Sequence, residues 1–242
     1  MAIPKIIHQT CRSYDALAPE LKDNIRFIKE NNPGWEHHLY DDAAVRQYFA
    51  RHLSAPQQRA LENLNPKYGV VLADLFRYLV VYHQGGVYLD VKSTARLPLD
   101  RVLRPEDSYL ISQWPNRLVE SSPGAGLHIE LFRVAGGEFQ QWHVIAEPGH
   151  AFLRNVLSNV LFNCANYSVS WFGVGKLGVL RVSGPICYTM AVVPLLPLHA
   201  HRIVSIDELG FRYSIYEEMG KRDHHARDPE HYSRLRERIF LR

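Results

Sequence analysis

Cysteine is scarce in this sequence: its 242 residues include three, Cys11, Cys164 and Cys187, which lie far apart. They form neither a C-x-x-C pair nor the even, closely spaced set that a disulfide framework requires. The pattern excludes a disulfide-stapled scaffold and predicts a protein of a reducing compartment.

Long apolar runs and an excess of charge of one sign are also missing. No apolar run reaches the roughly 20 residues of a membrane span, and the first ten residues lack the hydrophobic region of a signal peptide. The 28 basic and 25 acidic residues nearly cancel, so we expect no nucleic-acid partner. With 46% hydrophobic residues, the composition predicts one cytoplasmic domain over residues 1–242, at most peripheral on the inner face of a membrane.

One apolar stretch carries two opposite charges. Residues 70–81 predict a helix, in which Asp74 and Arg77 lie one turn apart and share a face. Gly85 and Gly86 end that helix, as glycine does at a C-terminal cap. The pair could be an intrahelical ion pair alone. Because its helix is otherwise apolar, we expect the pair to be partly buried, and buried charges are retained at a cost that favours a functional role.

A short buried strand with a charged exit follows the glycines. Val87, Tyr88 and Leu89 are β-prone, and Asp90 and Lys92 come next, on one side of the chain if the strand continues. A charged side chain at the end of a buried strand destabilises the fold unless it is paired with an opposite charge or binds a ligand. In open α/β sheets ligands bind at such strand ends, so this stretch predicts a binding site.

The rest of the chain predicts an α/β protein with helices added after the first hundred residues. We expect Asp42 to cap a helix over 43–49, and Ser183-Gly184-Pro185 to open the helix 186–193. The literal G-x-G-x-x-G at 173–178 follows no convincing strand and is not a dinucleotide fingerprint. Further strands are expected at 3–10, 35–40, 108–113 and 128–134, and a strand and turn at 203–209. Further helices are expected at 19–31, 151–162 and 45–64, the last divided by Pro56.

The D-x-x-R helix followed by G-G-V-Y-L-D resembles the nucleotide-sugar-binding core of glycosyltransferase family 32. I-P-K-I-I-H-Q-T at 3–10 and N-P-G-W-E-x-x-L-Y-D-D at 32–42 resemble the same family. It includes bacterial capsule and lipopolysaccharide sugar transferases and fungal mannosyltransferases, and it shares its core with the large clostridial glucosylating toxins. The resemblance implies a GT-A-like, Rossmann-type domain with a mixed sheet. Residues 1–100 would form the nucleotide-sugar half and residues 101–242 the acceptor half.

The resemblance also implies an activity and a set of site residues. We expect a retaining transfer of sugar from a nucleotide-sugar donor to a glycan or lipid-linked glycan acceptor, in capsule or lipopolysaccharide synthesis. Asp90 and Lys92 are the candidate catalytic residues. The candidate donor-binding residues are His8, Gln9, Thr10, Asp74, Arg77, Gly86, Tyr88, Asp90, Ser183 and Gly184.

The strand exit departs from the family motif. Family members carry D-x-D, whose second Asp binds a divalent metal, Mn²⁺ or Mg²⁺, on the diphosphate, whereas this chain reads Asp90-Val91-Lys92. An ammonium cannot ligate a cation. Either Lys92 supplies the positive charge itself, or Asp90 holds the metal with His224 and His225. A degenerate glycosyltransferase that binds without turnover is an alternative function, and a glycoside hydrolase with two carboxylates is another.

Overall fold

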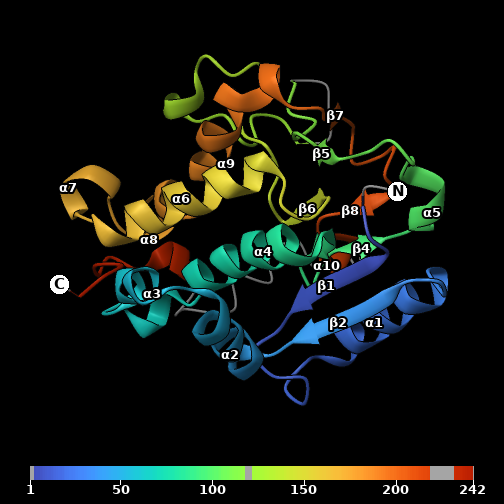
Figure 1. Cartoon of the computed structure of the whole chain (residues 1–242), viewed down its shortest axis with the longest axis horizontal. Coiled ribbons are helices and arrows are strands. Elements are labelled where there is room, and N and C mark those ends of the chain that lie inside the picture. Colours follow the sequence, from blue (N-terminus) through green and yellow to red (C-terminus); the bar gives the residue numbers. More distant parts are fainter. Residues whose placement is uncertain (1–2, 118–121, 219–231, 242) are drawn as a thin grey trace.

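The computed structural model describes residues 3–117, 122–218 and 232–241. One mixed sheet forms its centre (Figure 1). Its strands are β1 (Ile6–Thr10), β2 (Glu36–Tyr40), β3 (Gly86–Leu89), β5 (Tyr109–Ile111), β6 (His143–Ala146) and β7 (Arg202–Ile203). Their order is β2-β1-β3-β6-β5-β7, with β1 parallel to its two neighbours and β6 antiparallel to its own. The expected α/β fold with a mixed sheet is confirmed.

β1 and β3 bring their carboxyl ends to the same edge of the sheet. Ile7 pairs with Val87, and His8 pairs with Tyr88. All four residues of β3 are buried, as its unbroken apolar sequence predicts. The chain leaves β1 for β2 on one side and returns to β3 on the other, which makes the end of β1 a topological switch point.

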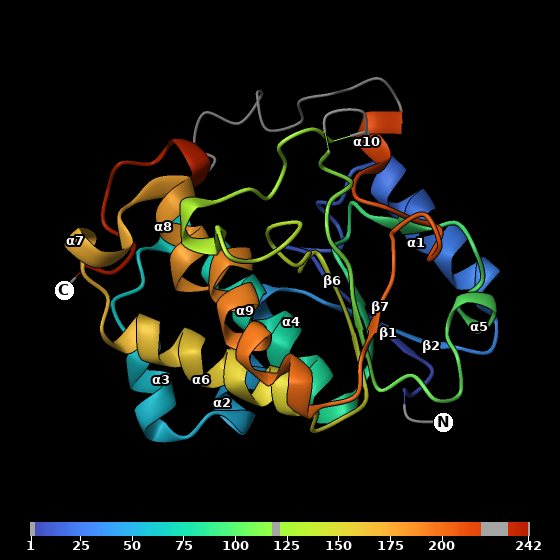
Figure 2. The same cartoon turned by 90° about the horizontal axis from the view of Figure 1, so that it is seen from above.

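Helices cover both faces of the sheet, seen edge-on in Figure 2. The first six are α1 (Pro19–Asn31), α2 (Asp42–His52), α3 (Ala55–Leu61), α4 (Val70–Gln84), α5 (Leu99–Val102) and α6 (Ala151–Ala165). On one face α4 and α6 pack with Tyr88 and Val144 in the larger core cluster. On the other, Ile28 of α1 and Leu99 of α5 pack with Val87. The alternating side chains of β3 thus serve two cores.

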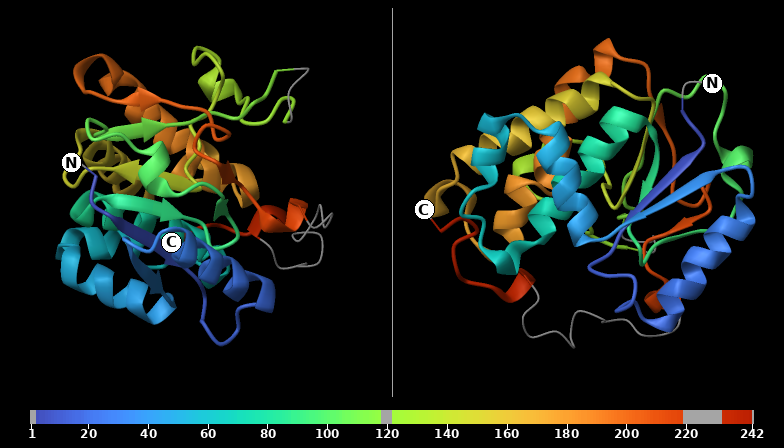
Figure 3. Two further views of the ribbon diagram at one scale, coloured as in Figure 1. Left: turned by 90° about the vertical axis from the view of Figure 1, so that its right-hand side faces the viewer. Right: turned by 60° about the horizontal axis from the view of Figure 1, so that its bottom comes forward.

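A second group of helices follows α6. It comprises α7 (Val169–Phe172), α8 (Gly175–Val182), α9 (Pro185–Val192) and the short α10 (Ile215–Glu218). Two short strands, β4 (Thr94–Ala95) and β8 (Phe211–Arg212), pair antiparallel, and β4 contacts α1. α9 packs on α6, and α10 lies beside the N-terminal end of α1 (Figure 3). The expected C-terminal helices are confirmed.

One helical stretch among the described residues, 175–198, is long and apolar enough to cross a membrane, which the sequence reading overlooked. It is not one continuous rod: α8 ends before Ser183, and α9 begins at Pro185. Of its most apolar window, 61% is buried inside the fold. Because the stretch is mostly buried and is interrupted at 183–184, we interpret it as part of the hydrophobic core.

Two local expectations were wrong, and one strand is shorter than expected. The helix cap is Asp41, whose side chain accepts a 2.8 Å hydrogen bond from the Ala44 amide, while Asp42 already lies in the first turn. Residues 128–134 form a 3-10 turn at Ile129–Leu131 instead of a strand, and Ile129 is 79% exposed. The late strand expected with a turn at 203–209 is only two residues long, Arg202–Ile203, and the turn follows it at 206–210. Alternating apolar residues form a strand only where a neighbouring strand is available for hydrogen-bonded pairing.

Candidate active site

A cavity of about 480 Å³ opens at the switch point, where β1 and β3 end. Its lining combines polar and charged side chains with a few apolar ones, among them Leu21 of α1 and Ala73 of α4. The lining residues are Thr10, Leu21, Ala73, Arg77, Tyr88, Asp90, Val91, Lys92 and Tyr216. The binding site expected at the end of β3 therefore coincides with a real hollow in the structure.

Arg77 joins two carboxylates at the floor of this cavity. Its Nη2 lies 3.3 Å from Asp74 Oδ1 and 3.2 Å from Asp90 Oδ1, and its Nη1 donates a 2.8 Å hydrogen bond to the Gln141 carbonyl. The side chains of Arg77 and Asp74 are 5% and 2% exposed, but that of Asp90 is 21% exposed. The pair predicted to be partly buried is fully buried, and Asp90 extends it to the cavity.

The charges of this network depend on one another. Burial alone would lower the pKa of Arg77, but Asp90, Tyr88 and Asp74 raise it above its usual range, so the guanidinium stays charged. Burial raises the pKa of Asp74, while Arg77 and Ser183 oppose the rise. Removing Arg77 would therefore leave Asp74 as an uncompensated buried charge.

Asp74 is also held by neutral donors. Ser183 Oγ donates to its Oδ2 at 2.8 Å, and Gln141 Nε2 donates to its Oδ1 at 3.2 Å. Ser183 lies in the break between α8 and α9 and is fully buried. Gly184 is the N-cap of α9, with Pro185 in its first turn, as the sequence indicates. The structure thus brings Ser183 into contact with Asp74, while Gly184 starts the helix α9 directly after Ser183.

β1 and β3 together position Asp90. Tyr88 Oη donates to Asp90 Oδ1 at 3.3 Å, and Thr10 Oγ1 lies within hydrogen-bond distance of the same hydroxyl, at 2.9 Å. Arg77 stacks on the Tyr88 ring, with its guanidinium carbon 5.0 Å from the ring centroid. Four of the residues expected to bind the donor therefore form one connected group at the cavity.

His8 and Gln9 do not reach the cavity. Both are fully buried: His8 Nε2 lies 3.0 Å from the Gly85 carbonyl oxygen, and Gln9 Oε1 lies 2.8 Å from His37 Nε2. Burial lowers the pKa of His8 to about 4, so its ring is neutral at pH 7. Of the three β1 residues, Thr10 alone lines the cavity. Donor contacts of the other two stay a prediction.

Gly86 allows an unusual backbone conformation at the start of β3. Its φ is +93°, and a Cβ there would collide with the Ile6 carbonyl oxygen of β1. Only glycine combines this conformation with this close approach. The structure gives Gly86 a role in pairing β3 with β1, and its direct contact with a donor stays a prediction.

Lys92 lies in the turn that follows Asp90, and its side chain contacts the C-terminal part of the chain. Its Nζ donates a 2.7 Å hydrogen bond to Tyr213 Oη and lies 4.0 Å from that ring centroid. Its carbonyl accepts from the Ile215 amide at 2.9 Å. Tyr213 and Gln141 were not predicted from the sequence, because neither belongs to a motif and both reach the site through long-range packing.

The described residues of the cavity do not suit a divalent cation. Asp90 is flanked by the Arg77 guanidinium and by the Lys92 ammonium, and both repel a cation. No cluster of three or more His, Cys, Asp or Glu side chains within residues 3–117, 122–218 and 232–241 could hold one. His224 and His225, the other expected ligands, lie outside those residues.

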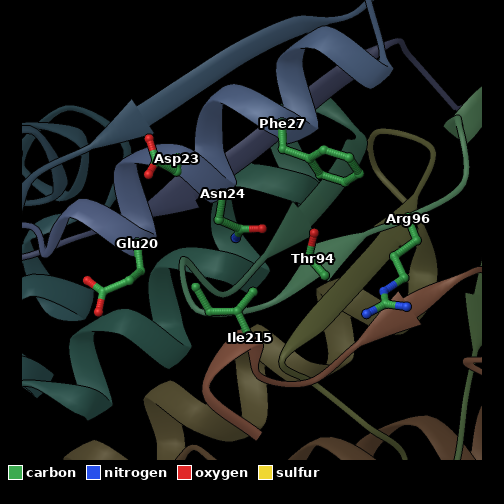
Figure 4. Close-up of a pocket in the computed structure, with 7 residues that line it drawn as sticks. All are labelled: Glu20, Asp23, Asn24, Phe27, Thr94, Arg96 and Ile215. Atoms are coloured by element: carbon green, nitrogen blue, oxygen red, sulfur yellow. The ribbon is translucent and has the colours of Figure 1, made fainter. Parts of the chain in front are cut away.

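A second cavity of about 530 Å³ adjoins the first across α10. Figure 4 shows side chains of α1 facing Thr94, Arg96 and Ile215 across this hollow. Ile215 lines this cavity, whereas the next residue, Tyr216, lines the first. Although this hollow is the larger, its lining includes none of Asp74, Arg77 and Asp90, so we place the active site in the smaller one.

Comparison with known proteins agrees with this placement. Residues 18–109 match the family model described as "Glycosyltransferase sugar-binding region containing DXD motif". Over 223 residues the chain is 26% identical to an initiation-specific alpha-1,6-mannosyltransferase of Schizosaccharomyces pombe, covering 85% of this chain and 53% of that protein. The chain thus spans about half the length of this curated relative. The matched region contains α4, β3 and the Asp74-Arg77-Asp90 network.

Solved structures identify the fold. The PaToxG glycosyltransferase superposes with a TM-score of 0.54 at 14% identity, covering 81% of this chain and 70% of that one. The UDP-bound glycosyltransferase domain of the YGT toxin superposes with a TM-score of 0.52 at 9% identity, covering 89% and 82%. The fold is of the GT-A type, as expected. These neighbours and the yeast relative are all glycosyltransferases, which supports a transferase activity for this chain.

Proposed function

We propose that this chain is a glycosyltransferase that moves a sugar from a nucleotide-sugar donor to a hydroxyl group of a glycan or lipid-linked glycan. The observation that carries the proposal is the buried Asp74-Arg77-Asp90 network, which opens into a cavity at the switch point of the sheet. A buried network of three charges costs stability and is well explained by a polar ligand. The matched sugar-binding region covers all three residues.

Each member of the network has a distinct part in donor binding. Asp90 reaches the cavity and accepts hydrogen bonds from sugar or ribose hydroxyls. Arg77 lines the cavity too, and it fixes the orientation of Asp90 while balancing its charge. Asp74 is buried and does not line the cavity, so its part is to hold Arg77 in place. Oriented charges of this kind need no reorganisation when the substrate arrives.

The finer features of the reaction come from the family resemblance. We propose retention of the anomeric configuration, because family 32 enzymes are retaining. The curated relative transfers mannose by its name, which makes mannose the first sugar to test. We further propose that the acceptor is a bacterial capsule or lipopolysaccharide glycan and that the protein works in the cytoplasm, peripheral to the inner face of the membrane.

Binding without turnover is the second candidate function, and Lys92 in place of the second Asp is the observation that favours it. Glycoside hydrolysis is less suited to the site. A hydrolase needs two carboxylates free to act on the glycosidic bond, whereas Asp74 and Asp90 share one Arg77 nitrogen and Asp74 is buried. The two carboxylates described in this network therefore cannot flank a substrate.

A donor panel tests the proposal. We would incubate the protein with GDP-mannose, UDP-glucose and related nucleotide sugars plus a capsule or lipopolysaccharide acceptor extract, and detect elongated glycan by mass spectrometry. Asp90→Asn should abolish transfer, while Glu62→Gln, at the exposed residue that follows α3, should not. NMR of the new anomeric signal reports retention or inversion. Donor binding with no product from any acceptor would favour the binding function instead.

A further inference from the structure

Lys92 stands two residues after Asp90, where the resemblance to D-x-D enzymes implies the second, metal-binding carboxylate. This residue is not a surface lysine that happens to follow the strand. It lines the same cavity as Asp90, is partly buried, and makes a 2.7 Å hydrogen bond with its ammonium group. A cation has thus replaced an anion at a defined place in the site.

The surrounding contacts hold this ammonium in place. Tyr213 receives its hydrogen bond and also offers its ring face 4.0 Å away. The backbone on both sides is fixed, because the Ser93 amide donates to the Asp90 carbonyl and the Lys92 carbonyl accepts from Ile215. An ammonium has three donors. Tyr213 Oη is the acceptor that the described residues supply, which leaves donors for a ligand in the cavity.

The replacement of a carboxylate by Lys92 changes the net charge of the site. Without Lys92, two carboxylates, Asp74 and Asp90, face one guanidinium, that of Arg77, whose Nη2 contacts both of them. Such a site is net negative and repels a diphosphate. With the Lys92 ammonium the four charges balance. Glu217, the other charged group acting on Lys92, is exposed on α10 and so is better screened by water.

We propose that Lys92 binds the donor diphosphate directly and takes the part that a divalent metal plays in DXD enzymes, so that this chain needs no metal to hold its donor. This inference rests on the proposed glycosyltransferase function. In that reaction the bond between the anomeric carbon and the diphosphate oxygen breaks, and its electron pair stays on the oxygen. The acceptor oxygen bonds to the anomeric carbon and loses its proton to solvent. The departing nucleoside diphosphate gains one negative charge, which Lys92 stabilises.

Calorimetric titration of the full chain with UDP and GDP tests the inference. We expect one of them to bind in EDTA, with an affinity within about threefold of that in Mn²⁺. Lys92→Met should weaken this binding by about 10- to 100-fold, which is the usual contribution of hydrogen bonds to a charged group. Lys176→Met, an exposed lysine on α8, is the matched control and should bind as wild type does.

Two further variants separate a charge effect from a folding defect. Lys92→Arg keeps the cation and should retain binding in EDTA. Lys92→Asp restores D-x-D and should bind only with Mn²⁺. UMP gives an internal reference: because it lacks the second phosphate, its affinity should fall less than that of UDP in Lys92→Met. Equal losses for UMP and UDP would indicate a structural role and contradict the inference.

The outcomes distinguish the two proposals. Wild-type binding that needs Mn²⁺ and disappears in EDTA would overturn the role of Lys92 and leave the glycosyltransferase function standing. It would also point to a metal held with the help of His224 and His225. Failure of every nucleotide and nucleotide sugar to bind, with or without Mn²⁺, would overturn the function itself and this inference with it.

Discussion

Ser183 Oγ donates a 2.8 Å hydrogen bond to Asp74 Oδ2, joining two residues that lie 109 positions apart. One comes from the middle of α4, and the other from the break between α8 and α9. The bond ties α4, in the first hundred residues of the chain, to the C-terminal helices. It also satisfies an oxygen that has no access to water, so its loss should affect both stability and the site.

Ser183→Ala should lower the free energy of unfolding by about 2 kcal/mol, because a buried carboxylate loses a charge-assisted hydrogen bond. Turnover should fall as well, since Asp74 is then free to shift away from Arg77. Urea denaturation followed by circular dichroism measures the first effect. Ser170→Ala, at an exposed serine, is the control and should change stability by less than about 0.5 kcal/mol. Equal stability of the two variants would contradict the proposed importance of the bond.

Arg77→Met should destabilise the protein by about 3–5 kcal/mol, because Asp74 is left as an unpaired buried charge. The double variant Asp74→Asn/Arg77→Met should recover part of that loss, since the amide carries no charge. Urea denaturation of both variants and of Asp74→Asn completes a thermodynamic cycle. A double variant that is less stable than Arg77→Met would show that the network contributes through hydrogen bonds more than through charge.

The sequence predicted the first hundred residues better than the rest. α4, the glycine turn and β3 follow each other without interruption, so local signals alone define them. Residues 128–134 show the limit of such signals. Their apolar residues alternate in part, yet Ile129 and Phe132 are exposed at 79% and 72% because the sheet offers them no neighbouring strand. Tertiary pairing, which the sequence pattern does not encode, decided the outcome.

The site was predictable where chemistry and motif coincide. Asp74, Arg77 and Asp90 were expected together, and the structure joins them through one guanidinium. Gln141 and Tyr213 were missed, because their neighbours in sequence carry no pattern and their contacts arise only from packing across the fold. A sequence motif identifies the residues that contact a ligand. The residues that support them can come from any segment that the fold brings close, so the motif does not identify them.

Gly86→Ala should destabilise the protein by about 2 kcal/mol or more, because a side chain at φ +93° is strained and its Cβ collides with the Ile6 backbone. The collision is with a strand and not with a flexible side chain, so relief requires β1 to move. Gly34→Ala is the matched control, since nothing lies within 4 Å of a Cβ built there. Thermal melting of the two variants checks the difference. If Gly86→Ala melted at the same temperature as the control, β1 would be able to shift away from the new side chain at little cost in stability, which would contradict this prediction.

Acid should destabilise the fold through two buried histidines. Burial lowers the pKa of His8 to about 4 and that of His143 to about 3, whereas an unfolded histidine titrates near 6.5. Between those values the unfolded chain binds protons that the folded chain does not, so stability falls as the pH falls below about 6.5 and is fully present above it. At pH 5 each histidine should cost about 2 kcal/mol relative to pH 7.5.

Urea denaturation at pH 7.5 and pH 5 measures this loss. His143→Phe keeps an aromatic ring between Trp142 and Phe211 but cannot bind a proton, so the difference between the two pH values should shrink by about 2 kcal/mol. His52→Gln, at an exposed position, should leave the difference as it is in the wild type. An unchanged difference in His143→Phe would mean that His143 gains no proton on unfolding in this range, and that other buried histidines, such as His150, drive the acid response.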